Sequence, residues 1–200
     1  MKKFLVMILA ALVGFSAVEA KPSKAFKKMV KEYKAEGWTV PIGNQPLENQ
    51  ISRSLEFQEA LDENGENKYV IGDAMSIGEN FDAAKFQAME LVKIDIASKL
   101  SSDITQLIDN QVAIKQLTAD EAASLVQTVS GGKGLISAKL GRLIQLVAVY
   151  RDKPNKNKEV RVVCAYSTKK AKEAALATIR ETLEDKSSEL SGKVDKLLGL

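Results

Sequence analysis

The chain contains no histidine and only one cysteine among its 200 residues. The absence of histidine excludes Ser-His-Asp and Cys-His nucleophilic arrangements, together with every zinc site that uses imidazole. One cysteine cannot form an internal disulfide or a multi-cysteine metal cluster. Most common hydrolase mechanisms are therefore excluded, and we expect neither a cofactor nor a bound metal.

The single cysteine, Cys164, lies inside the apolar run Val160–Tyr166. Burial keeps a thiol protonated and unreactive, so we interpret Cys164 as a buried, inert side chain. The alternative is a thiol that reacts or links two copies of the chain.

An excess of one charge is also lacking, because 29 basic residues face 26 acidic ones. A nearly neutral balance favours neither a nucleic-acid binder nor a strongly acidic partner. Carboxylate pairs could still perform acid-base chemistry, since glycoside cleavage requires only two of them. However, Asp82, Asp120 and Glu121 occupy expected helix starts, where negative charge is stabilising without any catalytic role.

The first residues have the order of a secretory signal peptide. Lys2 and Lys3 precede the apolar run Phe4–Phe15, and small or polar residues then lead to Ala20. Residues 1–20 are thus predicted to be a signal peptide, cleaved after Ala20. The apolar run is shorter than the roughly 20 residues that cross a bilayer, although an uncleaved anchor is the alternative. We expect an exported protein of the periplasm, outer membrane or cell surface, without a transmembrane segment.

A basic amphipathic helix is predicted over Ser23–Glu36. Apolar residues recur on one side at helical spacing, and lysines cover the other side. Such a helix could bind anionic lipid or an anionic envelope polymer, or its lysines could simply face solvent. The lysines that would contact an anionic surface are Lys24, Lys27, Lys28, Lys31 and Lys34.

Tyr33, near the end of this helix, and Trp38, just after it, flank Gly37. Aromatic side chains supply a large contact area at a small entropic cost, so both are candidate residues for contact with an envelope protein. The competing interpretation is that they pack the N-terminal helix onto the core.

The mature chain is divided into an N-terminal helical segment, 21–66, and an α+β domain with a C-terminal helix, 67–200. The pattern predicts a small antiparallel sheet of about three strands, a long central helix, and further helices packed on one face. Gly72 and Gly78 are interpreted as breaks in the chain. The elements expected are a helix from Pro46 to about Leu61, a strand Lys68–Gly72, a helix from Phe81 to about Asn110, a helix ending at Gly131-Gly132, strands Leu140–Tyr150 and Glu159–Tyr166, and a last helix carrying Leu190, Val194 and Leu197.

Two loops superficially resemble ligand-binding motifs. Ser130–Gly134 is glycine-rich, but no Gly-Lys-Ser/Thr closes it as a phosphate loop requires. Asp62, Asn64, Glu66 and Asp73 match four ligand positions of a calcium loop, but the glycine and glutamate that such a loop requires are missing. We therefore favour a helix terminus for the first loop and a polar turn for the second.

Three segments together carry a family resemblance: Tyr69–Gly72, the helix containing Ala83, Ala84 and Ala88, and Val160–Val163. Over roughly residues 68–180, the chain resembles the small envelope-lipoprotein family of bacterial surface antigens, whose domain is similar to the N-terminal domain of flagellar assembly protein T. The chain departs from that family because no cysteine follows the signal peptide. The resemblance implies a non-enzymatic envelope protein and no catalytic residue.

The leading hypothesis is therefore an exported interaction or structural module that binds an envelope protein or polymer. One alternative is a histidine-free hydrolase that cleaves cell-wall glycan through carboxylates. The other alternative is a binder of anionic surfaces that uses the N-terminal lysines.

Intact mass spectrometry of protein recovered from a bacterial envelope tests the export prediction. We expect a species that begins at Lys21 and carries no acyl chain, because residues 1–20 are removed and no acceptor cysteine follows them. A species that retains residues 1–20 would contradict cleavage.

Overall fold

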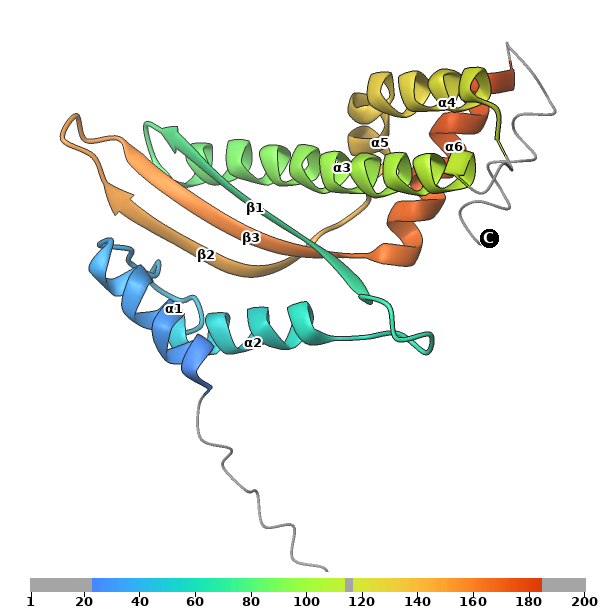
Figure 1. The fold of residues 1–200 in the computed structure, drawn as a ribbon. Coiled ribbons are helices and arrows are strands. Elements are labelled where there is room, and N and C mark those ends of the chain that lie inside the picture. Colours follow the sequence, from blue (N-terminus) through green and yellow to red (C-terminus); the bar gives the residue numbers. More distant parts are fainter. Residues whose placement is uncertain (1–22, 114–116, 185–200) are drawn as a thin grey trace, which may run out of the picture.

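The protein is a three-stranded antiparallel sheet held between two helical layers (Figure 1). The computed structural model describes residues 23–113 and 117–184. The predicted signal peptide, 1–20, and the residues Leu190, Val194 and Leu197 of the predicted last helix lie outside these residues. No described helix combines the length and the apolar character that crossing a membrane requires.

The sheet has the strand order β1-β3-β2. Every neighbouring pair is antiparallel; Gly72 lies opposite Cys164, and an irregularity between Gln145 and Val147 interrupts the pairing of β2 with β3. Valine is frequent in β2 and β3, as expected of half-buried or buried strands. The strands are β1 (Tyr69–Gly78), β2 (Ile144–Asp152) and β3 (Lys158–Ser167).

Helix α3 (Phe81–Ala113) covers one face of the sheet and is the longest element. Its start is capped by Asn80, whose side-chain oxygen accepts the Ala83 N–H at 2.9 Å, as predicted. The residues that α3 buries recur every four positions, so one stripe of the helix packs on β1 and β3. The stripe over the sheet consists of Ala84, Ala88, Val92 and Ile96.

The opposite face is covered by α1 (Lys24–Ala35) and α2 (Leu47–Glu59). These helices enclose a second apolar cluster with residues of β2 and β3. Its buried members are Tyr33, Trp38, Leu47, Ile51, Leu146, Val147, Val149, Val163 and Ala165.

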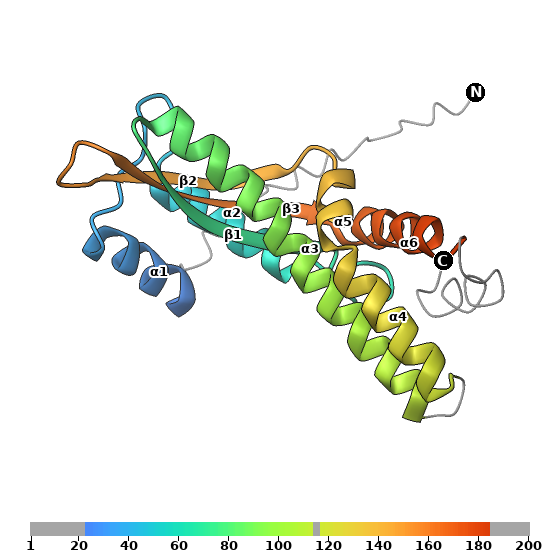
Figure 2. The same ribbon diagram turned by 90° about the horizontal axis from the view of Figure 1, so that it is seen from above.

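The three remaining helices gather around the C-terminal half of α3, which extends beyond the sheet (Figure 2). The predicted capping box is present, because Thr118 and Glu121 each accept the backbone N–H of the other. Buried leucine, isoleucine and valine side chains join these helices to the core of α3. The helices are α4 (Ala119–Gly131), α5 (Lys133–Lys139) and α6 (Thr168–Glu184).

The predicted α+β class, the three-stranded antiparallel sheet and the long central helix are all confirmed. The helices, however, cover both faces of the sheet rather than one. The reason is visible in β2 and β3, where the runs Leu146–Val149 and Val162–Tyr166 are buried at every position. A strand that is apolar on both sides requires cover on both sides.

Gly72 does not break the chain, and β1 continues through it to Gly78. A Cβ at position 72 would lie 2.8 Å from both Val92 Cγ1 and Ile96 Cγ1, and 2.9 Å from the Val92 carbonyl oxygen. The missing side chain therefore lets α3 approach the strand closely. A glycine within a strand pattern can mark a break or bend, or a place where another backbone approaches closely, and Gly72 is of the latter kind.

Gly72→Ala is expected to lower the free energy of unfolding by about 1–3 kcal/mol, because the added methyl group overpacks the contact between α3 and β1. Urea denaturation of the variant and the wild type measures the difference. Gly134→Ala is the matched control, since no atom outside its chain neighbours and its own helical turn lies within 4 Å of the added Cβ, and alanine favours a helix. Equal stability of Gly72→Ala and wild type would contradict the close contact.

Candidate functional site

Helix α1 separates a lysine face from an apolar face. It begins at the cap of Ser23, whose hydroxyl oxygen accepts the Phe26 N–H at 3.1 Å. Phe26, Met29, Val30 and Tyr33 are directed at the sheet-side cluster. The exposed residues on the opposite side, which we call the lysine face, are Lys24, Lys27, Lys28, Lys31 and Lys34.

Two of these lysines have ion-pair partners. Lys28 lies 3.7 Å from Glu32, one turn along the helix, and Lys34 lies 2.6 Å from Glu48 of α2. The hydrogen bond from Lys34 holds the pKa of the Glu48 carboxyl below its ordinary value. Within residues 23–113 and 117–184, no carboxylate pairs with Lys24, Lys27 or Lys31. These three ammonium groups supply the net positive charge of the face.

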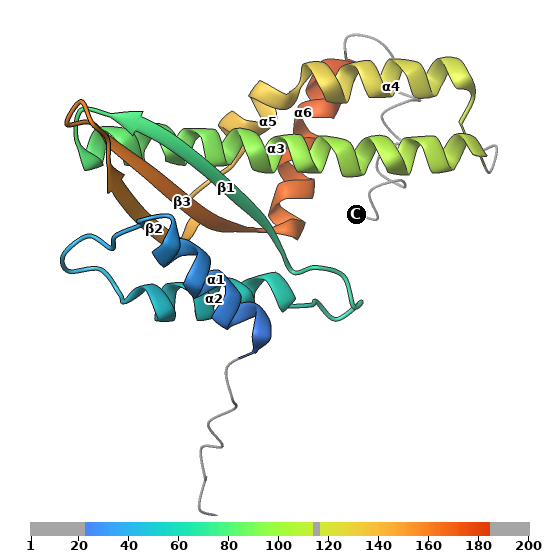
Figure 3. The ribbon, with the colours of Figure 1, turned by 60° about the vertical axis from the view of Figure 1, so that its left-hand side comes forward.

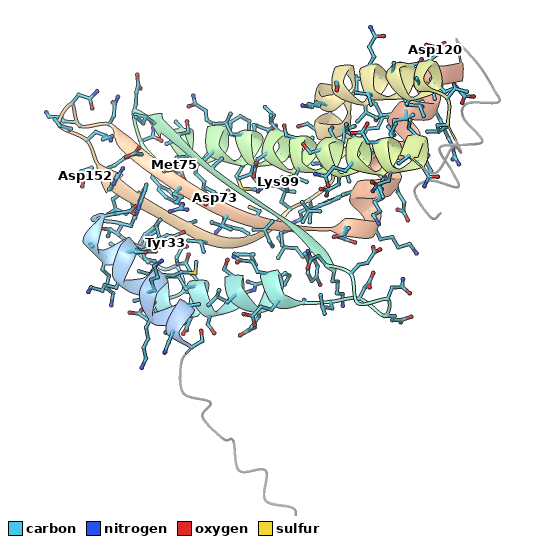
Figure 4. The ribbon with its side chains drawn as sticks, viewed as in Figure 1. Tyr33, Asp73, Met75, Lys99, Asp120 and Asp152 are labelled. Carbon is cyan, nitrogen blue, oxygen red and sulfur yellow. The ribbon has the colours of Figure 1, made fainter. Side chains whose placement is uncertain are left out.

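Tyr33 joins α1 to the sheet and is only 5% exposed. The guanidinium of Arg161 lies over its ring, 4.9 Å from the centroid, which is a cation–π contact. The same guanidinium is bound by both carboxylate oxygens of Asp73 on β1, with Nε to Oδ1 at 3.0 Å. The Asp73 hydrogen bond keeps the pKa of Arg161 above its ordinary value. Tyr33, Arg161 and Asp73 thus form one contact between α1, β3 and β1. Figure 4 labels Tyr33 and Asp73.

Trp38 is held in the same way beside Tyr33, whose backbone carbonyl accepts the Trp38 N–H at 3.1 Å, and is 6% exposed. Arg151 lies 4.5 Å from its ring centroid, and the indole N–H donates to Glu36 at 2.8 Å. Arg151 also donates to Glu159 at 2.6 Å, while Lys153 lies 2.8 Å from the same carboxylate. The Arg151 hydrogen bond is the main reason that the pKa of Glu159 lies below its ordinary value. The segment after α1 is therefore fixed on β2.

The structure thus separates the two sets of residues that the sequence suggested. The five lysines share one exposed face, whereas Tyr33 and Trp38 offer almost no area to a partner and instead pack α1 onto the sheet. The arginines that stack on these rings were not anticipated. The sequence did contain one indication of such a contact, because the charged Arg161 interrupts the apolar run Val160–Tyr166.

The acidic residues considered for calcium serve structural roles. Asp62 accepts the backbone N–H groups of Asn64 and Glu66 and so fixes the turn before β1. Asp73 lies within β1 and binds Arg161. In the part of the chain that the structure describes, no three His, Cys, Asp or Glu residues converge on a possible metal position.

A polar hollow lies between α3 and the junction of α4 with α5. Its lining carries hydroxyl, amide and ammonium groups but no carboxylate, so it offers no acid pair for glycan hydrolysis. Ser130 and Lys133 of the glycine-rich segment contribute to it, at the end of one helix and the beginning of the next. The lining residues are Ser101, Ser102, Thr105, Gln106, Ser130 and Lys133.

Cys164 is fully buried, as predicted. Its sulfur lies 3.6 Å from that of Met89 on α3. Burial raises the pKa of the thiol to about 12, so the nucleophilic thiolate form is suppressed at neutral pH.

No protein-family model matches the chain, and no curated protein or solved structure shows significant similarity to it.

A tyrosinate absorbance titration tests the packing of Tyr33. Burial raises the pKa of its hydroxyl from 10.0 to about 12; Arg161 acts in the opposite direction, while Asp73 and Glu36 raise the pKa further. The difference between wild type and Tyr33→Phe should therefore titrate near pH 12. A difference centred near pH 10, with the fold intact by circular dichroism, would show that Tyr33 is solvated.

The same shift has a consequence for stability. The folded-state pKa of Tyr33 lies above that of the unfolded chain. The contribution of Tyr33 to the free energy of unfolding is therefore complete below pH 10. It is lost as pH rises toward 12, by at most about 1.4 kcal/mol per pH unit. Tyr33→Phe should lack this part of the alkaline destabilisation.

Proposed function

We propose that this protein is an exported, non-enzymatic interaction module of the bacterial cell envelope that binds anionic lipid headgroups through the lysine face of α1. The observation that carries the proposal is the exposure of Lys24, Lys27 and Lys31 on one side of a single helix without carboxylate partners among the described residues. Positive charge arranged in this way attracts phosphate-bearing surfaces.

The mode of binding follows from the other face of the same helix. Phe26, Met29, Val30 and Tyr33 already pack in the cluster below the sheet. The apolar side of α1 is therefore not available for insertion between acyl chains, which is how free amphipathic helices bind a membrane. The interaction is electrostatic and peripheral, and it weakens as salt screens the lysines.

Three features support an envelope location. Residues 1–20 have the pattern of a signal peptide, and the lysine face begins four residues after the expected cut. The resemblance to the small envelope-lipoprotein family of bacterial surface antigens also supports an envelope location. The glycan-hydrolase alternative stays a prediction without a specific observation in its favour.

Replacing Lys24, Lys27 and Lys31 together with glutamine is expected to weaken binding to vesicles rich in phosphatidylglycerol. Each lysine near an anionic surface contributes about 1 kcal/mol, so the loss is on the order of 100-fold in affinity at low salt. Co-sedimentation with vesicles measures it, and wild-type binding should fall steeply as the salt concentration rises.

The matched control replaces Lys133, Lys169 and Lys170, three exposed lysines on α5 and α6, with the same total change in charge. This variant should retain wild-type affinity, because its substitutions lie away from the lysine face. Equal losses in the two variants would show that net charge, rather than α1, drives binding. Wild-type binding to an isolated anionic glycan, but not to vesicles, would identify a polymer instead of a lipid surface.

A further inference from the structure

The two edges of the sheet are protected to different extents. The β2 edge is covered where Thr39 and Tyr150 exchange backbone hydrogen bonds of 2.8 and 2.9 Å. Beside them, the Ala148 N–H donates to the side-chain oxygen of Gln50 at 2.8 Å. An exposed strand edge is a template for pairing with another chain, so this cover prevents extension of the sheet on the β2 side.

The β1 edge is covered along only half of its length. Lys99 of α3 donates to the Ile71 carbonyl at 2.8 Å, and the Asp73 N–H donates to Asp95 at 3.0 Å. These backbone groups point away from β3, and in an antiparallel ladder the direction alternates with a period of two. The N–H and C=O groups of Met75 and Ile77 therefore also point outward. Among the described residues, no hydrogen bond covers them.

Apolar side chains surround this open stretch. Met75 and Ile77, on the sheet face that carries α1, are 51% and 48% exposed. On the α3 side, Leu91 is 42% exposed. Leu91 lies one helical turn from both Gln87, which binds Ser76, and Asp95, which binds Asp73. Its side chain therefore flanks the same edge, which forms the front of the sheet in Figure 3.

We propose that a second copy of this chain pairs with the open half of β1, antiparallel and about a two-fold axis at Ser76. This register places Met75 opposite the partner's Ile77, and Ile77 opposite the partner's Met75. Each of these pairs exchanges two backbone hydrogen bonds and joins two apolar side chains on one face. The result is a continuous six-stranded sheet.

The register is selected by the capped half of the strand. A shift of two residues toward the start of β1 would place Asp73 in the hydrogen-bonded ladder, but its N–H is already bound by Asp95. A shift of two residues in the other direction would pair Met75 with the partner's Glu79, which lies beyond the end of the strand. In the proposed register, Asp73 lies beside the ladder opposite the partner's Glu79, and Arg161 neutralises its charge. The new ladder therefore uses only the backbone groups of Met75 and Ile77, which have no hydrogen-bond partner among the described residues.

A second copy fits this edge better than an isolated peptide strand. Helix α3 runs antiparallel to β1, because Ala84 lies at Gly78 while Val92 and Ile96 lie at Gly72. Two-fold pairing therefore brings two α3 helices together on the same face, with Leu91 at the seam, whereas an isolated strand brings no second helix. Because the β2 edges are covered, the assembly closes at two copies rather than growing into a fibre.

Disulfide trapping tests both the contact and its register. Ser76 faces its own symmetry mate as a non-hydrogen-bonded pair, with Cα atoms about 4.5 Å apart, which lies within the range of a disulfide. Ser76→Cys should therefore form a covalent dimer on mild oxidation. Ala74→Cys is the matched control, because its two copies would be displaced by about four residues, or roughly 13 Å, along the strands. It should remain largely unlinked, as should wild type with its buried Cys164.

Analytical ultracentrifugation of the mature chain provides the independent measurement. Wild type should show a reversible dimer, and Ile77→Lys should raise its dissociation constant about tenfold or more. Leu135→Lys alters an equally exposed apolar residue on α5 and should leave the dimer unchanged. A wild-type monomer at all concentrations, or linking of Ala74→Cys as fast as Ser76→Cys, would overturn the proposal. Loss of lipid binding by the lysine variant would not affect either result.

Discussion

The close contact between α3 and β1 determines most of the architecture. Two glycines on the strand, Gly72 and Gly78, face small or β-branched residues of the helix at distances that leave no room for a Cβ. Helix α3 is therefore held along the sheet, and its side chains reach over the edge of β1, where Lys99 and Asp95 bind the backbone. The same helix continues past the sheet and supports α4, α5 and α6.

Much of this fold could be predicted from local patterns. The capping residues Asn80 and Thr118 fixed the beginnings of two helices, and the β-branched runs identified β2 and β3. Gly72 was misinterpreted because a glycine that breaks a strand and a glycine that admits a helix look alike in one sequence. Helix α5 was missed for a related reason, since the glycines around Lys133 predicted an ending rather than a new short helix.

The candidate sites depended more strongly on tertiary context. The spacing of the lysines was sufficient to place all five on one face, because helical periodicity is local. The burial of Tyr33 and Trp38 could not be predicted from local spacing. Their rings pack against Arg161 and Arg151, which lie more than a hundred positions away in the chain. The open half of β1 was likewise invisible in the sequence. It depends on which side chains of α3 reach the edge.

The layer below the sheet has a consequence for the order in which the chain folds. Helices α1 and α2 are made first during synthesis, but their apolar faces dock on β2 and β3, about a hundred residues later. The hydrogen bonds of Gln50 with Ala148 and of Glu36 with Arg151 can form only after β2 has been synthesised. Contacts so distant in sequence are slow to form because a long loop must close first. We therefore expect the N-terminal helices to dock last.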